Sequence, residues 1–162
     1  MVELRPAIIS LAEQEVKFVI IGGVAINLHS SAYVTEDFDF CFSRERENLK
    51  RIVKALASFR PRLRGFSKDL PFVWDEQTLL DGTNFTLETE IGDIDLLGEV
   101  KGVGNYSDVE KESTIMSLFG FDIKVLSIEG LIKAKRAAGR TKDLLVLPEL
   151  EGLQEFLSRQ EE

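Results

Sequence analysis

The spacing of apolar residues predicts a chain in which helices and strands alternate. Residues 44–59 carry apolar side chains at intervals of three and four positions, with charged residues between them, which is the pattern of an amphipathic helix. Residues 37–42, DFDFCF, alternate between polar and apolar side chains, as in a strand with one buried face. A continuous apolar run at residues 17–22 predicts a further strand.

The other segments complete an α+β order. Gly120 divides one strand pair, Ile91 and Gly92 separate the two strands of a hairpin, and Ser127 is expected to cap a helix. We expect helices over residues 5–15, 24–32, 128–139 and from about 148, strands over 83–90, 93–100 and 114–126, and a loop over 101–113. This order predicts an α+β domain with helices mainly on one face of a sheet.

Length, cysteine usage and the N-terminal sequence set the broad class. The 162 residues, of which 44% are apolar, can bury one core, so we expect one domain over residues 1–162 that includes the C-terminal helices of about 128–160. The single cysteine, Cys41, cannot form an intramolecular disulfide. The sequence has neither a signal-peptide pattern nor an apolar run of the roughly 18 residues that a membrane span needs. We therefore expect a cytoplasmic protein that does not contact a membrane.

The net charge limits the partners. A formal charge of −8 argues against a broad, sequence-independent nucleic-acid surface, because such a surface needs many cations to displace counterions from phosphates. A local basic patch can still contact a nucleic acid. Residues 58–68 carry four basic residues and no acid, and they stay open as a solvated loop or as a contact to an acidic substrate or RNA.

Asp37 and Asp39 are the first candidate functional residues. Successive side chains of a strand point to opposite faces, so both carboxylates share one face while Phe38 and Phe40 point into the core. Adjacent carboxylates repel each other unless a cation lies between them. Carboxylate oxygens on a rigid element suit Mg²⁺ or Mn²⁺, and Mg²⁺ takes its other ligands from water and phosphates.

Gly22 and Gly23 fit the same chemistry, because they lie between a predicted strand and a predicted helix. A turn without side chains lets phosphate oxygens approach backbone N–H groups at the positive end of a helix. A nucleoside triphosphate (NTP) with its metal is the natural ligand. A third carboxylate would allow two metals about 3.5–4 Å apart, and the segment GDIDLL offers Asp93 or Asp95.

Together these motifs resemble the minimal nucleotidyltransferases of the polymerase-beta-like superfamily, in particular bacterial members that are toxin-related or uncharacterised. The shared pattern is G-G, a short helix, T-x-D-x-D on the next strand and one Asp on a later strand, followed by a C-terminal segment similar to residues 131–150. The resemblance covers most of the chain. It implies a mixed or antiparallel sheet and an enzyme that transfers a nucleoside monophosphate and releases pyrophosphate.

The resemblance also implies a role for each site residue. Asp37, Asp39 and Asp95 would be the catalytic, metal-binding acids, with Asp95 preferred to Asp93 because it stands directly before two leucines. The nucleotide would be bound by a further group of residues: Gly22, Gly23, Thr35, Lys135, Arg140, Lys142 and Asp143. One departure is Tyr33, which stands where relatives often carry an arginine.

Other functions remain open from the sequence. A D-x-D pair in a chain with 28 acidic residues can be a solvated strand face. The fold can also serve as an inactive binding module or as a component of a toxin–antitoxin pair. Phosphatases of the haloacid dehalogenase type use D-x-D as well, but without a preceding glycine pair and helix. The acceptor, which can be RNA, a protein or a small molecule, and the partner, which can be a second copy or an antitoxin, are not determined.

Overall fold

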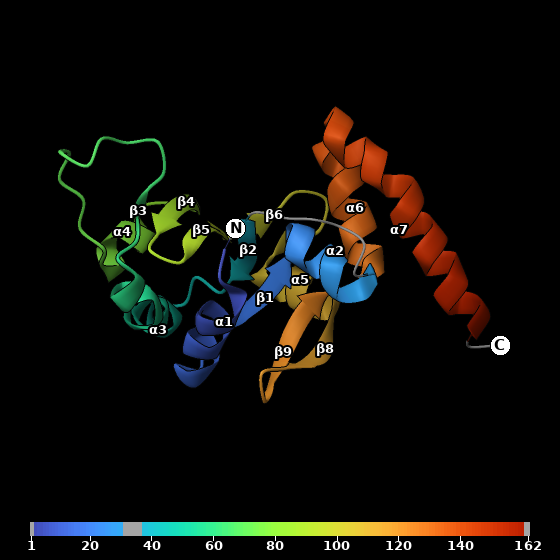
Figure 1. Ribbon diagram of the computed structural model, residues 1–162, viewed down its shortest axis with the longest axis horizontal. Helices are drawn as coiled ribbons and strands as arrows, with labels where there is room; N and C mark the ends of the chain where they lie inside the picture. The colour runs from blue at the N-terminus through green and yellow to red at the C-terminus, as the bar shows by residue number, and fades with distance from the viewer. Residues whose placement is uncertain (1, 31–36, 161–162) are drawn as a thin grey trace.

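The computed structural model describes residues 2–30 and 37–160 (Figure 1). Within these residues, seven strands form one mixed sheet in the order β3-β4-β5-β2-β1-β9-β8. The strands are β1 (Phe18–Ile21), β2 (Asp37–Phe42), β3 (Arg62–Leu63), β4 (Asn84–Thr89), β5 (Gly92–Leu97), β8 (Ser113–Leu118) and β9 (Phe121–Leu126), and the pair β6 (Glu99–Val100) and β7 (Gly104–Asn105) forms a separate ribbon. The predicted α+β class with a mixed, mainly antiparallel sheet is confirmed.

The helices lie around this sheet. They are α1 (Leu4–Glu13), α2 (Gly22–Ser30), α3 (Arg46–Leu56), α4 (Glu76–Leu80), α5 (Tyr106–Lys111), α6 (Ile128–Ala138) and α7 (Thr141–Gln160), with the 3₁₀ turn η1 (Ala57–Phe59) after α3. Helix α1 packs on α3, where the Ser10 hydroxyl donates to the carbonyl of Ala55 (2.6 Å). Helix α2 follows β1 directly and contacts β1, β2 and α6, while α6 packs on α7. In Figure 1, α6 and α7 lie together at one end of the molecule, away from α3 and α4.

The central strands β2 and β5 are parallel neighbours whose register separates a charged face from an apolar face. Asp37 pairs with Asp93 and Asp39 with Asp95, and paired residues point to the same side of a sheet. The residues between them, including Phe38 and Ile94, are fully buried. Burying a large apolar side chain contributes about 1.5–3 kcal/mol, so the apolar face fixes the register, and the register places the aspartates on the opposite face.

Most predicted elements are present. Helix α6 begins at the Ser127 cap, whose hydroxyl accepts the N–H of Gly130 (3.1 Å). The strands β8 and β9 pair around residues 119–120 as expected, and β4 pairs with β5, although Gly92 is the first residue of β5 and not part of the turn.

Three sequence predictions were wrong. Residues 101–113 are not a simple loop, because they contain β7 and α5, which Asn105 and Asp108 start with a capping box. Helix α7 begins at Thr141 and contains Pro148, whereas we expected it to begin near the proline. The strand expected over residues 93–100 ends at Leu97, and Glu99–Val100 form β6 of the separate ribbon. These elements are too short for periodicity to reveal, or they depend on contacts with distant strands.

None of the helices within residues 2–30 and 37–160 combines the length and the apolar character that a membrane span requires.

Candidate active site

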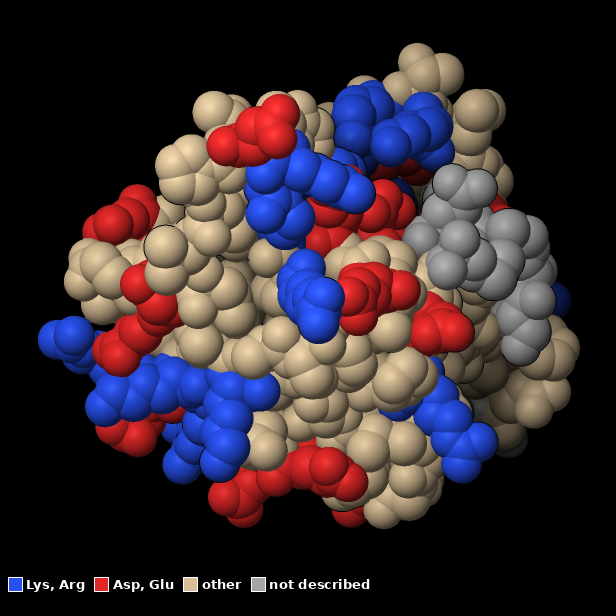
Figure 2. All heavy atoms as spheres, turned by 60° about the vertical axis from the view of Figure 1, so that its left-hand side comes forward, with Lys and Arg blue, Asp and Glu red and all other residues tan. Residues whose placement is uncertain are grey.

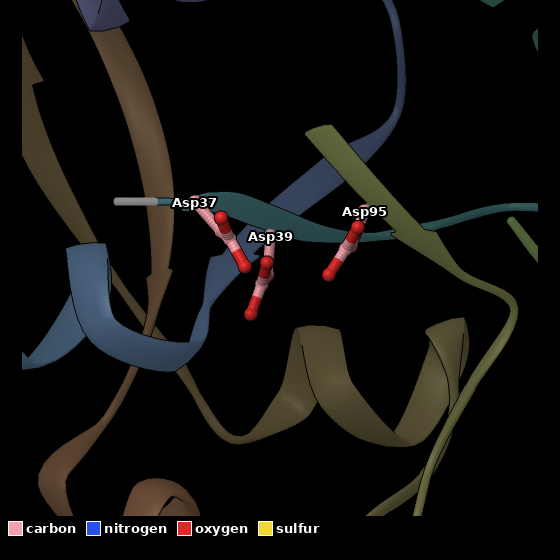
Figure 3. A group of neighbouring side chains, drawn as sticks. All are labelled: Asp37, Asp39 and Asp95. Carbon is pink, nitrogen blue, oxygen red and sulfur yellow. The ribbon is translucent and has the colours of Figure 1, made fainter. Parts of the chain in front are cut away.

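Three carboxylates converge on the charged face of the sheet. Asp37 and Asp39 extend from β2 and Asp95 from β5, and all three point to the same side (Figure 3). One carboxylate oxygen from each lies within 4.8 Å of the others. The structure therefore groups Asp95, and not Asp93, with the D-x-D pair.

The surroundings of Asp39 disfavour the charged form of its carboxyl group. Burial, followed by the negative charges of Asp95 and Asp37, raises the pKa of Asp39 from its ordinary value near 3.8 to about 7. Its Oδ1 atom is buried and has no hydrogen-bond partner among the described residues. Burial also raises the pKa of Asp95, although Arg64 opposes this effect.

These residues fit a divalent metal ion. Three carboxylates with a buried, unpaired oxygen offer the hard ligands that Mg²⁺ and Mn²⁺ prefer, and a bound cation would remove the mutual repulsion of the acids. The chemistry of this donor set is the reason for the fit.

Gly22 brings the start of α2 against the acids. Its φ of +68° is a conformation that residues with side chains rarely adopt, and a Cβ atom at this position would lie 2.5 Å from Asp39 Oδ2. The backbone at the beginning of α2 therefore approaches Asp39 closely because residue 22 is a glycine. Gly23 follows it in the first turn of the same helix.

A cavity of about 190 Å³ adjoins Asp39 and Gly22. Lys135 and Arg140 contribute cationic walls, and Asp143 lies beside them with no exposed surface. Asp143 accepts hydrogen bonds from Arg140 Nε (2.6 Å) and Lys135 Nζ (3.1 Å). The bonds from Arg140, followed by those from Lys135, lower the pKa of Asp143 to about 2. Asp143 thus holds Lys135 at the cavity wall as a buried anion.

Of the remaining predicted site residues, the structure describes Lys142. Lys142 is exposed and does not line this cavity. Thr35 and Tyr33 lie outside the described residues. Figure 2 shows Lys and Arg side chains in separate groups with Asp and Glu between them on the face in view.

Sequence reasoning missed two cations near the acids. Arg64 donates to Asp95 Oδ1 (2.7 Å) from the segment that follows β3, and the four basic residues of 58–68 were the only signal. Lys101, between β6 and β7, lines the cavity. Its neighbour Gly102 packs so closely on α6 that a Cβ atom would lie 2.6 Å from the Lys133 carbonyl oxygen. No sequence pattern indicated this contact.

The comparisons with known proteins agree with this architecture. The chain is similar to ANT(2″)-Ia, solved in complex with adenylyl-2″-tobramycin, at 15% identity and a TM-score of 0.56, covering 97% of this chain and 96% of that one. It is also similar to a nucleotidyltransferase candidate from Thermotoga maritima (TM1012), at 17% identity and a TM-score of 0.53, covering 96% and 91%. No protein-family model and no curated protein matches the sequence. The chain thus has a nucleotidyltransferase-like fold.

The raised pKa of Asp39 predicts a pH-dependent stability of the metal-free protein. Because the pKa is higher in the folded state than in the unfolded state, this group favours folding at low pH, and its contribution is lost as the pH rises from about 4 to about 7. Asp39→Asn should therefore raise the free energy of unfolding at pH 8 by about 1–3 kcal/mol and have little effect at pH 4. Urea unfolding in EDTA at both pH values measures this, and equal effects at the two would refute it.

The close approach of Gly22 to Asp39 predicts that a single methyl group disturbs the acids. Gly22→Ala should weaken Mn²⁺ binding at least about tenfold, because the added Cβ displaces the Asp39 carboxylate. Gly120→Ala is the matched control, since Gly120 has a φ of +86° and open space around its Cβ position. Both variants carry the backbone strain, so titration of Mn²⁺ by electron paramagnetic resonance isolates the contact. Equal affinities in the two variants would contradict the assignment.

Proposed function

We propose that the protein is a nucleotidyltransferase that transfers a nucleoside monophosphate from an NTP to a hydroxyl or phosphate oxygen of an acceptor. One observation carries the proposal: the carboxylates of Asp37, Asp39 and Asp95 converge beside a cavity with cationic walls. Acids bind the metal of a metal–triphosphate complex, and lysine and arginine bind its phosphates. The nucleotidyltransferase-like fold supports the same activity.

In this proposal the three acids have different roles. Asp37 and Asp39 share one strand and would hold the Mg²⁺ or Mn²⁺ ion of the NTP complex. Asp95, on the neighbouring strand, serves the acceptor. A divalent cation bound here supplies the positive charge that favours attack at the α-phosphate and departure of pyrophosphate.

The reaction makes one bond and breaks one. The acceptor oxygen forms a bond to the α-phosphorus of the NTP, and the bond from that phosphorus to the bridging oxygen of the β-phosphate breaks. Pyrophosphate leaves with the electron pair, and a hydroxyl acceptor loses its proton through the Asp95 carboxylate to solvent. Lys135, Lys101 and the backbone N–H groups at the start of α2 hold the phosphates.

The reacting group of the acceptor is a hydroxyl or phosphate oxygen, and the acceptor itself can be RNA, a protein or a small molecule. The neighbour ANT(2″)-Ia was solved with an adenylylated aminoglycoside, so tobramycin is one reasonable test compound beside RNA and protein fractions. A nucleic-acid acceptor would need a local contact, since the chain carries a net charge of −8. A second copy or an antitoxin remains a candidate partner.

Labelling tests the activity itself. The purified protein is incubated with Mg²⁺, each α-labelled NTP in turn, and tobramycin, total RNA or a cell lysate. Transfer of label to one fraction together with pyrophosphate release is the expected result. Binding of Mg·NTP without transfer to any acceptor would indicate an inactive binding module instead.

Because the acids have different roles, their asparagine variants should show different defects. Asp39→Asn should abolish metal-dependent NTP binding and transfer together, whereas Asp95→Asn should keep NTP affinity within about threefold and lower the transfer rate at least about a hundredfold. Asp93→Asn is the matched control on the same strand and should retain most of the activity. Full activity in Asp95→Asn with loss of activity in Asp93→Asn would show that Asp93, and not Asp95, is the third acid of the site.

The position of Lys101 predicts a binding defect. Lys135 shares its charge between Asp143 and the phosphates, whereas Lys101 has no ion-pair partner among the described residues. Lys101→Ala should therefore raise the KM for NTP about five- to twentyfold with a smaller change in kcat. Lys111→Ala, at the end of α5, is the control. An unchanged KM in Lys101→Ala would remove this residue from the nucleotide site.

A further inference from the structure

Arg64 lies in the same cross-strand row as the acids. Its backbone N–H donates to the carbonyl of Thr86 (2.9 Å), which extends the pairing of β3 with β4 by one residue. Thr86 pairs with Asp95 across β4 and β5, and Asp95 pairs with Asp39 across β5 and β2. The row therefore runs over four strands on one face of the sheet, with a cation at one end and the candidate metal ligands at the other.

The guanidinium group of Arg64 is held by several contacts. Nη2 donates to Asp95 Oδ1 (2.7 Å) and to the carbonyl oxygen of Leu87 (2.9 Å), while Nε lies 3.3 Å from Asp93 Oδ2. The side chains of Arg64 and Asp95 are 29% and 18% exposed. Arg64 thus binds one oxygen of Asp95 at a site that is largely shielded from solvent. The second hydrogen bond of Nη2, to the Leu87 carbonyl oxygen, limits the rotation of the guanidinium group.

We propose that Arg64 is a positioning residue with two effects on the acids. It fixes the orientation of Asp95 for the acceptor step, and its charge opposes the binding of a divalent cation by the three acids. The inference rests on the proposed function and deepens it. The orientation requires the rigid guanidinium group, in which Nη2 donates to Asp95 and to the Leu87 carbonyl while Nε lies 3.3 Å from Asp93 without a hydrogen bond. The single ammonium nitrogen of lysine, on a flexible stem, cannot occupy both positions at once. The opposition to the metal requires only the positive charge.

A merely structural ion pair between the segment after β3 and β5 would behave differently. Its loss would loosen the edge of the sheet and weaken metal binding and turnover together. The proposed role instead predicts opposite changes: tighter metal binding, because one competing cation is gone, and slower turnover, because Asp95 is no longer oriented.

The experiment compares Arg64→Gln, Arg64→Lys and Arg60→Gln. Arg60 is the matched control, since it belongs to the same group of basic residues in 58–68. Among the described residues its side chain pairs only with Glu90, in an exposed contact. Mn²⁺ affinity is measured by electron paramagnetic resonance without nucleotide, and pyrophosphate release is measured from an equimolar mixture of the four NTPs together with the acceptor fraction that takes up label from the wild-type protein. We expect Arg64→Gln to bind Mn²⁺ about three- to tenfold more tightly and to release pyrophosphate at least about tenfold more slowly. Arg60→Gln should match the wild type in both.

Arg64→Lys separates the two effects and keeps the test decisive if Arg64→Gln does not fold. Lysine retains the charge but not the rigid guanidinium group, so Mn²⁺ affinity should stay near that of the wild type while pyrophosphate release falls. Weaker or unchanged Mn²⁺ binding in Arg64→Gln, or wild-type pyrophosphate release in Arg64→Lys, would overturn the inference and leave the proposed function intact. A wild-type protein that binds no Mn²⁺ would overturn both.

Discussion

The repulsion among three carboxylates that the sheet holds together is the constraint on which the rest of the site depends. The parallel register of β2 and β5 sets Asp39 beside Asp95, and the alternation along β2 adds Asp37. The acids cannot move apart, because the residues between them are fixed in the core, where Phe38 and Ile94 are fully buried. Apolar packing on one face of the sheet thus maintains an unfavourable concentration of charge on the other.

The protein relieves this repulsion in part, through cations that come from distant segments. Arg64 reaches Asp95 from the segment after β3, and Lys135 on α6 lowers the pKa of Asp39 from the opposite side. Lys135 is itself held by the buried Asp143. Burial, followed by the charges of Asp95 and Asp37, still raises the pKa of Asp39 to about 7. A divalent cation bound among these acids would relieve their mutual repulsion.

The same arrangement separates two sides of the site. The cavity with Gly22, Lys101 and Lys135 lies on the side of α2 and α6, whereas Arg64 approaches Asp95 from the side of β3 and β4. In the proposed function the triphosphate would bind on the first side, which offers lysines and the backbone of a helix start. The acceptor would then approach from the second, where the candidate metal ligands meet a fixed arginine. Different segments of the chain can therefore determine nucleotide and acceptor recognition.

Local patterns in the sequence determined the central strands, the helices α3 and α6 and the aspartates that share a strand face, because hydrophobic periodicity and side-chain alternation are properties of neighbouring residues. The tertiary structure decided which acid joins Asp37 and Asp39, because that choice depends on the register between β2 and β5, strands more than 50 residues apart in sequence. It also decided that Arg64 binds Asp95, that Lys101 lines the cavity and that Lys142 does not. Contacts of this kind leave no periodic signal, since they arise only when distant segments pack on one sheet.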